Sequence, residues 1–232
     1  MKLHPKWKVA GAWILAFAIV LGIKLGRTAS VGPDAEVLAI GLQSDGRAVL
    51  GGRFGDSRIQ RRNPDGSPDT TFGHAWSVGG FNAAVFSLAI QSDDRIVAGG
   101  EFTNFDASLM GYIARLNPDG SLDTTFARGI GTGFDAPVLS VASLADGRIL
   151  AAGHFTSFNG TRVGHVARLL PTGTLDTTFN SGSGFDGPVH TIAVRDGAPT
   201  IFGGAFNAYR DQNHRSLASV GEDGAPVELG SP

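Results

Sequence analysis

The chain has 232 residues, of which 42% are hydrophobic, 17% are charged and 34 are glycine, and its formal net charge is −2. This charge excludes an extended nucleic-acid surface, which needs a basic stripe. The absence of cysteine excludes disulfides, thiolate metal sites, cysteine nucleophiles and a lipidated cysteine anchor. Glycine-rich, charge-poor chains are typical of turn-rich β-structure, and about 200 residues remain after the hydrophobic start, enough for one domain with its own core.

Residues 1–27 carry the pattern of an export signal. Three lysines within the first eight residues precede an apolar run over residues 9–23, which is followed by Lys24 and Arg27. As a helix the run rises about 22 Å, against roughly 30 Å for a bilayer core, a gap that flanking lysines can bridge by snorkelling. Two interpretations stay open: a signal peptide cleaved near Ala29, or an uncleaved anchor helix with its N-terminus in the cytoplasm. Both predict that residues 28–232 are exported and are periplasmic, at the cell surface or secreted.

Residues 28–232 repeat one module of about fifty residues four times. The copies align on valines that lie 48, 53 and 51 residues apart: Val37, Val85, Val138 and Val189. Repeats of this length with a glycine pair near a strand end are typical of blade-like units. The resulting repeat units cover residues 32–79, 80–132, 133–183 and 184–232.

Each unit is predicted to contain four short antiparallel strands. In the second unit the first two cover residues 85–91 and 95–102, and an Asp-containing turn joins them. The third covers residues 112–117 and ends in an Asn-Pro-Asp-Gly turn, after which a fourth strand is expected over residues 123–126. The pair Gly99-Gly100 should admit a close neighbour. Because one unit cannot bury both faces alone, the units are expected to stack face to face.

Three runs recur between units: NPDGSLDTTF, DGRIL followed by AGHF, and GFDAPV. They resemble the delta-60 repeat family over about residues 37–206. The resemblance implies a bacterial surface or secreted β-propeller, with no general biochemical activity. The fold expected is all-β: a propeller-like array of four antiparallel four-stranded units, preceded by one N-terminal hydrophobic helix.

Two features depart from a closed propeller. Propellers usually close with more than four blades, and the last copy has Val227-Glu228-Leu229 where the others have Leu-Asp-Thr, so its fourth strand is expected to be missing. Three alternatives stay open: an open arc, a ring completed by a second chain, or a fragment of a larger surface repeat protein. An open arc would expose apolar blade faces and favour self-association.

An arginine and an aspartate recur eight residues apart in the first three units. The pairs are Arg61 with Asp69, Arg115 with Asp123, and Arg168 with Asp176. The fourth unit has Ser219 and Val227 instead, so both partners are lost together. Since catalytic groups are singular whereas structural groups repeat, the pattern predicts ion pairs that tie the third and fourth strands.

The connector between the second and third strands carries the binding candidates. It is three residues long in the first unit and nine in the others, where it contains an aromatic residue: Phe105, Phe158 or Tyr209. The rings either grip a glycan or peptide beside polar neighbours, or pack between units and seal the core. Tyr209, with Asp211 and His214 nearby, is the least core-like, and these five residues form the candidate binding set.

The leading functional prediction is a non-enzymatic scaffold that binds a protein, peptide or carbohydrate through its loop edges. The alternatives are a polysaccharide lyase or hydrolase of propeller type, or a fragment of a larger protein. An enzyme would have to use the residues that break the repeat: His154, His165, His190 and Asp211. No nucleophile-elbow or phosphate-loop motif is present, and the acidic turns lack the closing glutamate of a calcium loop. We therefore expect no metal and no cofactor, a membrane contact only through the N-terminal helix, and self-association or ring completion.

Overall fold

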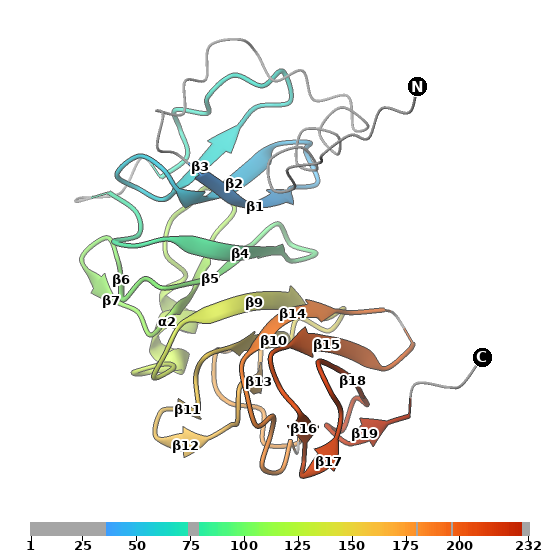
Figure 1. Ribbon diagram of the computed structural model, residues 1–232. Coiled ribbons are helices and arrows are strands. Elements are labelled where there is room, and N and C mark those ends of the chain that lie inside the picture. Colours follow the sequence, from blue (N-terminus) through green and yellow to red (C-terminus); the bar gives the residue numbers. More distant parts are fainter. Residues whose placement is uncertain (1–35, 74–78, 180, 196, 229–232) are drawn as a thin grey trace, which may run out of the picture.

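The computed structural model describes residues 36–73, 79–179, 181–195 and 197–228. Within them, four antiparallel sheets follow one another along the chain and stack as successive units (Figure 1). The predicted export signal and N-terminal helix lie outside the described residues. Among the described ones, no helix is long and apolar enough to cross a bilayer.

Each unit consists of a sheet of consecutive antiparallel strands, and units two to four add a two-stranded side hairpin. Unit 1 has the strands β1 (Glu36–Leu42), β2 (Ala48–Arg53) and β3 (Ile59–Arg62). Unit 2 has β4 (Val85–Ile90), β5 (Ile96–Gly100) and β8 (Ile113–Leu116), with the side hairpin β6 (Asn104–Phe105) and β7 (Ser108–Leu109). Unit 3 has β9 (Val138–Ser143), β10 (Ile149–Gly153) and β13 (Val166–Leu169), with the side hairpin β11 (Ser157–Phe158) and β12 (Thr161–Arg162). Unit 4 has β14 (Val189–Ala193), β15 (Thr200–Gly204), β18 (Leu217–Val220) and β19 (Pro226–Val227), with the side hairpin β16 (Ala208–Tyr209) and β17 (Gln212–Asn213).

The predicted fourth strand is wrong for units 1 to 3, whose main sheets have three strands and keep only isolated bridges at that place: Arg62–Pro68, Leu116–Leu122 and Leu169–Leu175. In unit 2 a helix takes its place. Helix α2 (Thr124–Ile130) follows directly after Asp123, whose side chain accepts hydrogen bonds from the N–H groups of Thr125 (3.0 Å) and Phe126 (3.2 Å). An aspartate in this position satisfies the first free N–H groups of a helix, and this outweighs the β-propensity of the two threonines. The fourth strand is reduced to an isolated bridge between Leu116 and Leu122.

The fourth unit also differs from the prediction, in the opposite direction. It was expected to lack a fourth strand, yet β19 pairs with β18 through Ser219 and Val227 and completes a four-stranded sheet. Val227 stands where the other units have the capping aspartate. Valine has no side-chain acceptor for the free N–H groups of a helix start, whereas its branched side chain fits a pleated edge, so here the chain continues as strand.

Neighbouring units pack through close contacts made by glycine. A Cβ atom on Gly51 would lie 2.7 Å from Cγ1 of Val85 in the next unit. The corresponding atom on Gly99 would lie 2.6 Å from Cγ1 of Val138. The glycine pair therefore admits a close neighbour, as predicted, and at Gly99 that neighbour is a side chain from the first strand of the following unit.

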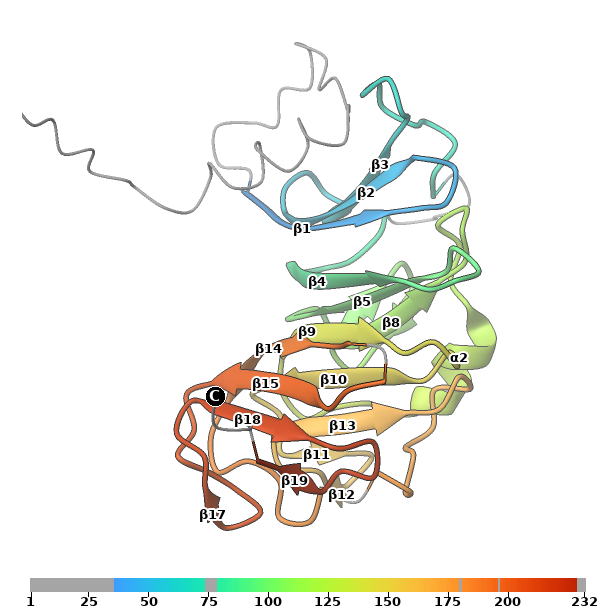
Figure 2. The same ribbon diagram turned by 90° about the vertical axis from the view of Figure 1, so that its right-hand side faces the viewer.

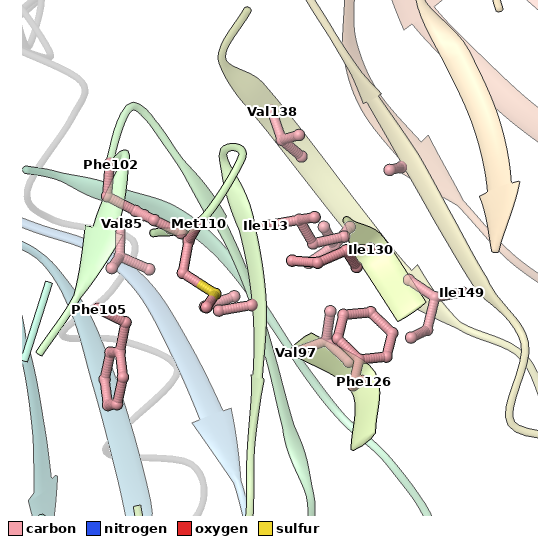
Figure 3. Close-up of a cluster of buried hydrophobic side chains, with 14 of the residues drawn as sticks. Val85, Val97, Phe102, Phe105, Met110, Ile113, Phe126, Ile130, Val138 and Ile149 are labelled. Atoms are coloured by element: carbon pink, nitrogen blue, oxygen red, sulfur yellow. The ribbon is translucent and has the colours of Figure 1, made fainter. Parts of the chain in front are cut away.

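The core lies in the interfaces between neighbouring units and not within each unit separately. We call these interfaces the first seam (units 1 and 2), the second seam (units 2 and 3) and the third seam (units 3 and 4). Figure 3 shows Val85, Phe102 and Phe105 gathered on one side of the second unit, and Phe126 and Ile149 on the other. All five are at most 1% exposed. Phe126 belongs to α2 of the second unit and Ile149 to β10 of the third, so the helix adds its apolar face to the core that these two units share.

The four units form an open arc. Units 1 and 4 lie at opposite ends of the array in both views (Figures 1 and 2). Of the three alternatives, the described part of one chain therefore has the open form and does not close into a ring by itself.

Candidate functional site

The structure places each recurring arginine against the aspartate eight residues on. The distances between guanidinium nitrogen and carboxylate oxygen are 2.8 Å for Arg61 and Asp69, 2.8 Å for Arg115 and Asp123, and 2.7 Å for Arg168 and Asp176. Every side chain in these pairs is at most 8% exposed. Each guanidinium also lies over a phenylalanine ring, 4.6 to 4.9 Å from its centre.

The environment keeps these carboxylates charged. Burial alone would raise the pKa of Asp69, but hydrogen bonds from the Thr71 hydroxyl and N–H, together with Arg61, outweigh it and lower the pKa to about 2. The pKa of Asp176 is lowered in the same way by Thr178 and Arg168. A carboxylate held in its charged form by hydrogen bonds and a paired arginine is a poor general base, so these pairs are structural elements.

The same arginines help to close the first two seams, together with a glutamine. In the first seam, Nη1 of Arg61 donates to Oε1 of Gln43 (3.0 Å) and to the carbonyl of Pro118 in the next unit. In the second, Nη1 of Arg115 donates to Oε1 of Gln91 at 3.4 Å. Both glutamines lie in the turn that follows the first strand of their unit, and both are buried.

The third seam is built differently and contains a cavity. Leu144 stands at the position of the two glutamines, although Arg168 still reaches across the seam to the carbonyl of Glu222. A cavity of about 470 Å³ lies there, between the hairpin turns of units 3 and 4. Its lining includes Leu144, Phe179 and Val194. This volume falls in the range of small-ligand pockets, which combine apolar walls with a few polar groups.

Four charged side chains form the rim of this cavity: Asp146, Arg148, Arg195 and Glu222. Nη2 of Arg148 lies 2.6 Å from Oε1 of Glu222, and its Nε contacts Asp146. The hydrogen bond that Arg148 donates to Glu222, together with its hydrogen bond to Asp146, raises the pKa of the Arg148 guanidinium. Arg195, at the glutamine position of unit 4, also lines the cavity and is exposed. The turn edge of the third seam is therefore a polar rim above an apolar floor.

The three aromatic binding candidates lie in the core. Phe105, Phe158 and Tyr209 are at most 2% exposed. Each packs against a phenylalanine of the lead-in, which is the short segment that precedes the first strand of its unit. The ring centroids lie 4.7, 4.9 and 4.4 Å apart in the pairs Phe81–Phe105, Phe134–Phe158 and Phe185–Tyr209.

The interpretation of these rings as a ligand platform is corrected by their burial, and the packing alternative describes them. Tyr209 was expected to be the least core-like, yet its hydroxyl donates to the carbonyl of Gly224 at 2.6 Å, and burial raises its pKa. Asp211 is exposed and accepts a hydrogen bond from Ser183 (3.3 Å), and His214 is half-buried. Recurrence of the ring in three units was the signal for a core role, because repeated residues are those that hold units together.

Of the histidines that break the repeat pattern, two lie near each other at the surface. His154 and His190 are exposed, with ring centres 6.4 Å apart. His165 is half-buried, its Nδ1 lies 3.2 Å from the carbonyl of Gly153, and burial lowers its pKa. Within the described ranges, no three His, Cys, Asp or Glu side chains are arranged to hold a metal ion.

The cavity in the third seam was not found by sequence reasoning. A signal for it exists: aligning the repeats places Leu144 against Gln43 and Gln91, and Pro199 against Arg148. These substitutions acquire meaning only when the seam contacts of the glutamines are known.

Comparisons with known proteins show the repeat type. Residues 43–72, 91–126 and 144–179 match the family described as a domain of unknown function (DUF5122) beta-propeller. The matches fall in three of the four units, so the chain carries β-propeller repeats. No curated protein sequence matches the chain.

Several solved structures are similar at low sequence identity. Virginiamycin B lyase from Staphylococcus aureus aligns with 18% identity and a TM-score of 0.47, over 87% of this chain and 58% of the lyase. A protein of unknown function from Bacteroides caccae aligns with 13% identity and a TM-score of 0.47, over 84% of this chain and 67% of that one. The WD40 beta propeller domain of Doa1 aligns with 14% identity and a TM-score of 0.47, over 82% and 66% of the two chains. This chain therefore spans little more than half the length of the lyase.

Proposed function

We propose that this chain of β-propeller repeats is a non-enzymatic scaffold that binds a protein, peptide or carbohydrate through the turn edge of its third seam. The observation that carries the proposal is the cavity of about 470 Å³ between units 3 and 4. The first two seams are crossed at the same place by buried glutamines, whereas the third has Leu144 there, which makes no such contact among the described residues. The proposed binding site therefore lies at the turns between the first and second strands and not at the connectors, whose rings are buried.

The chemistry of the rim supports binding and not catalysis. Arg168 is paired with Asp176 at 2.7 Å and Arg148 with Glu222 at 2.6 Å. Hydrolysis or elimination requires an acid or base whose pKa lies near the working pH. The lowered pKa of Asp176 and the raised pKa of Arg148 move both groups away from that range.

The test is retention of the purified full-length chain on arrays of peptides and of glycans. Arg195→Glu reverses a charge at the rim, and Arg128→Glu makes the same change at an exposed position of α2 as a control. We expect the wild type to be retained by one ligand class, Arg195→Glu to reduce retention at least fivefold, and the control to leave it unchanged. Equal losses for both variants, or no retained ligand, would contradict the proposal.

We also propose that the repeats are of the delta-60 kind and that residues 1–27 export the domain and tether it to the membrane. The supporting observation is the lysine-flanked apolar run over residues 9–23. Alkaline phosphatase fused after residue 36 should be active outside the cytoplasm and sediment with membranes. The same fusion without residues 1–27 should be inactive, and activity of that control would refute the export proposal.

A further inference from the structure

The glutamine in the first seam shows which groups meet between two units. Nε2 of Gln43 donates to the carbonyl of Asp94 (3.0 Å) and to that of Pro118 (3.2 Å), both in the next unit. Its Oε1 accepts from Nη1 of Arg61 at 3.0 Å. One primary carboxamide therefore connects an arginine of one unit with two turn carbonyls of the other.

The second seam repeats this arrangement. Nε2 of Gln91 donates to the carbonyl of Gly147 (3.1 Å), which occupies the position of Asp94, and Oε1 accepts from Arg115 at 3.4 Å. The site is thus a recurrent one, made of an arginine donor and a turn carbonyl acceptor separated by the width of a carboxamide.

The third seam has counterparts of the arginine and of the two turn carbonyls, but it has no glutamine carboxamide between them. Arg168 takes the position of Arg61, and the carbonyls of Ala198 and Glu222 take those of Asp94 and Pro118. Leu144 offers neither a donor nor an acceptor. Nη1 of an arginine carries two hydrogens, and the contact to the Glu222 carbonyl uses one of them. Ala198, Glu222 and Arg168 all line the cavity.

We propose that the third seam binds a peptide through a glutamine side chain, whose carboxamide occupies the place filled by Gln43 and Gln91 in the other seams. This inference rests on the proposed function, since it names the ligand of the same cavity. The carbonyl of the ligand accepts from Arg168, and its amide donates to the carbonyls of Ala198 and Glu222. Leu150, Phe179 and Val194 provide apolar wall for the methylene groups and for the flanking residues.

The internal precedent favours a glutamine-bearing peptide over a sugar. In both occupied seams the carboxamide is a primary amide on a flexible aliphatic stem. An N-acetylated sugar offers a secondary amide, with one N–H for two carbonyl acceptors. A primary amide has two N–H groups and can donate to both carbonyls, so it fits this site better.

The experiment compares three blocked tripeptides on the full-length chain by isothermal titration calorimetry. They are acetyl-Gly-Gln-Gly-amide, the glutamate analogue and the norleucine analogue, which share one backbone and differ only in the side-chain end. We expect the glutamine peptide to bind at least tenfold more tightly than either analogue, because only its carboxamide offers both a donor and an acceptor. Equal binding of all three would overturn the inference, and so would tighter binding of N,N′-diacetylchitobiose than of the glutamine peptide.

A variant of the seam provides the second measurement. Leu144→Gln restores the residue of the other seams and should occupy the site from within, reducing affinity for the glutamine peptide at least tenfold and raising the melting temperature. Leu109→Gln makes the same exchange at an 80% exposed position of β7 outside the cavity; it is the control and should bind like the wild type. Undiminished peptide binding by Leu144→Gln, or a lower melting temperature, would overturn the inference. If the arrays retain a ligand that Leu144→Gln does not displace, only this inference fails; if they retain none, the proposed function fails as well.

Discussion

At the scale of single residues, the most informative pattern is the paired loss of an arginine and an aspartate. Three units bury the pair, and the fourth has Ser219 and Val227. A buried charge without its partner is strongly destabilising, so the two residues can be lost only together. In unit 2 the aspartate has a further role, because Asp123 also caps α2.

We expect Asp123→Ala to lower the free energy of unfolding by about 3 to 5 kcal/mol, because it leaves Arg115 buried and unpaired and removes the helix cap. Asp123→Asn keeps a good cap and should cost less. Urea denaturation followed by circular dichroism measures both changes. Asp93→Ala, which removes an exposed partner of Arg95, is the control and should cost less than about 1 kcal/mol. An unchanged midpoint for Asp123→Ala would show that the pair does not stabilise the unit.

At the scale of secondary-structure elements, the long connectors are tied back to the lead-in of their own unit. Oδ1 of Asp135 accepts from the N–H groups of Thr156 (2.8 Å) and Ser157 (3.0 Å), which begin the connector of unit 3. The adjacent ring, Phe134, contacts Phe158 with a centroid distance of 4.9 Å. Each side hairpin is thus fixed to the lead-in of its own unit, by hydrogen bonds at its start and by the packing of its aromatic ring.

Replacing Phe158, the aromatic residue of the side hairpin in unit 3, distinguishes a core role from a binding role. We expect Phe158→Ala to lower the free energy of unfolding by about 3 to 5 kcal/mol, as for other buried aromatic residues. Leu109→Ala, at an 80% exposed position of β7, should change it by less than about 0.5 kcal/mol. Thermal melting measures both. Loss of array binding in Phe158→Ala without loss of stability would restore the ligand-platform interpretation.

At the scale of the whole molecule, units 1 and 4 each have an outer face that no other described unit covers. Leu88 and Ile90 of unit 2 pack against unit 1 next to Gly51 and Gly41. The corresponding residues of unit 1, Ile40 and Leu42, are 42% and 37% exposed, and Leu217 on unit 4 is 48% exposed. Within the described residues, the array has three complete interfaces between units, and the outer faces of units 1 and 4 remain without a partner unit.

We therefore expect head-to-tail self-association, in which unit 4 of one copy packs on unit 1 of another. Light scattering after size exclusion should show a mass above the monomer that increases with concentration. Ile40→Glu should shift the mass to the monomer, whereas Leu109→Glu, on a side hairpin, should leave it unchanged. A concentration-independent monomer for the wild type would contradict this expectation.

Contacts within one unit could be predicted from the sequence. An arginine and an aspartate eight residues apart across a hairpin turn meet because the turn brings them together, and the repeat shows it three times. Turn chemistry likewise placed the first three strands, because Asp-Gly and Asn-Pro-Asp-Gly have few conformations available. The exception was the fourth strand, which is reduced to an isolated bridge in units 1 to 3. In unit 2 the capping side chain of Asp123 starts a helix where the threonines predicted a strand.

The sequence by itself determined that about fifty residues recur as a β-hairpin unit, and which residues each unit needs to hold its own strands. Only the tertiary structure decided that the connector rings point into the core, that the four described units are arranged as an open arc, and that the third seam contains a cavity. The physical reason is distance along the chain. Hairpin contacts are local and leave their mark on neighbouring positions, whereas the carboxamide, the arginine and the turn carbonyls of a seam are brought together by packing between units that no local pattern encodes.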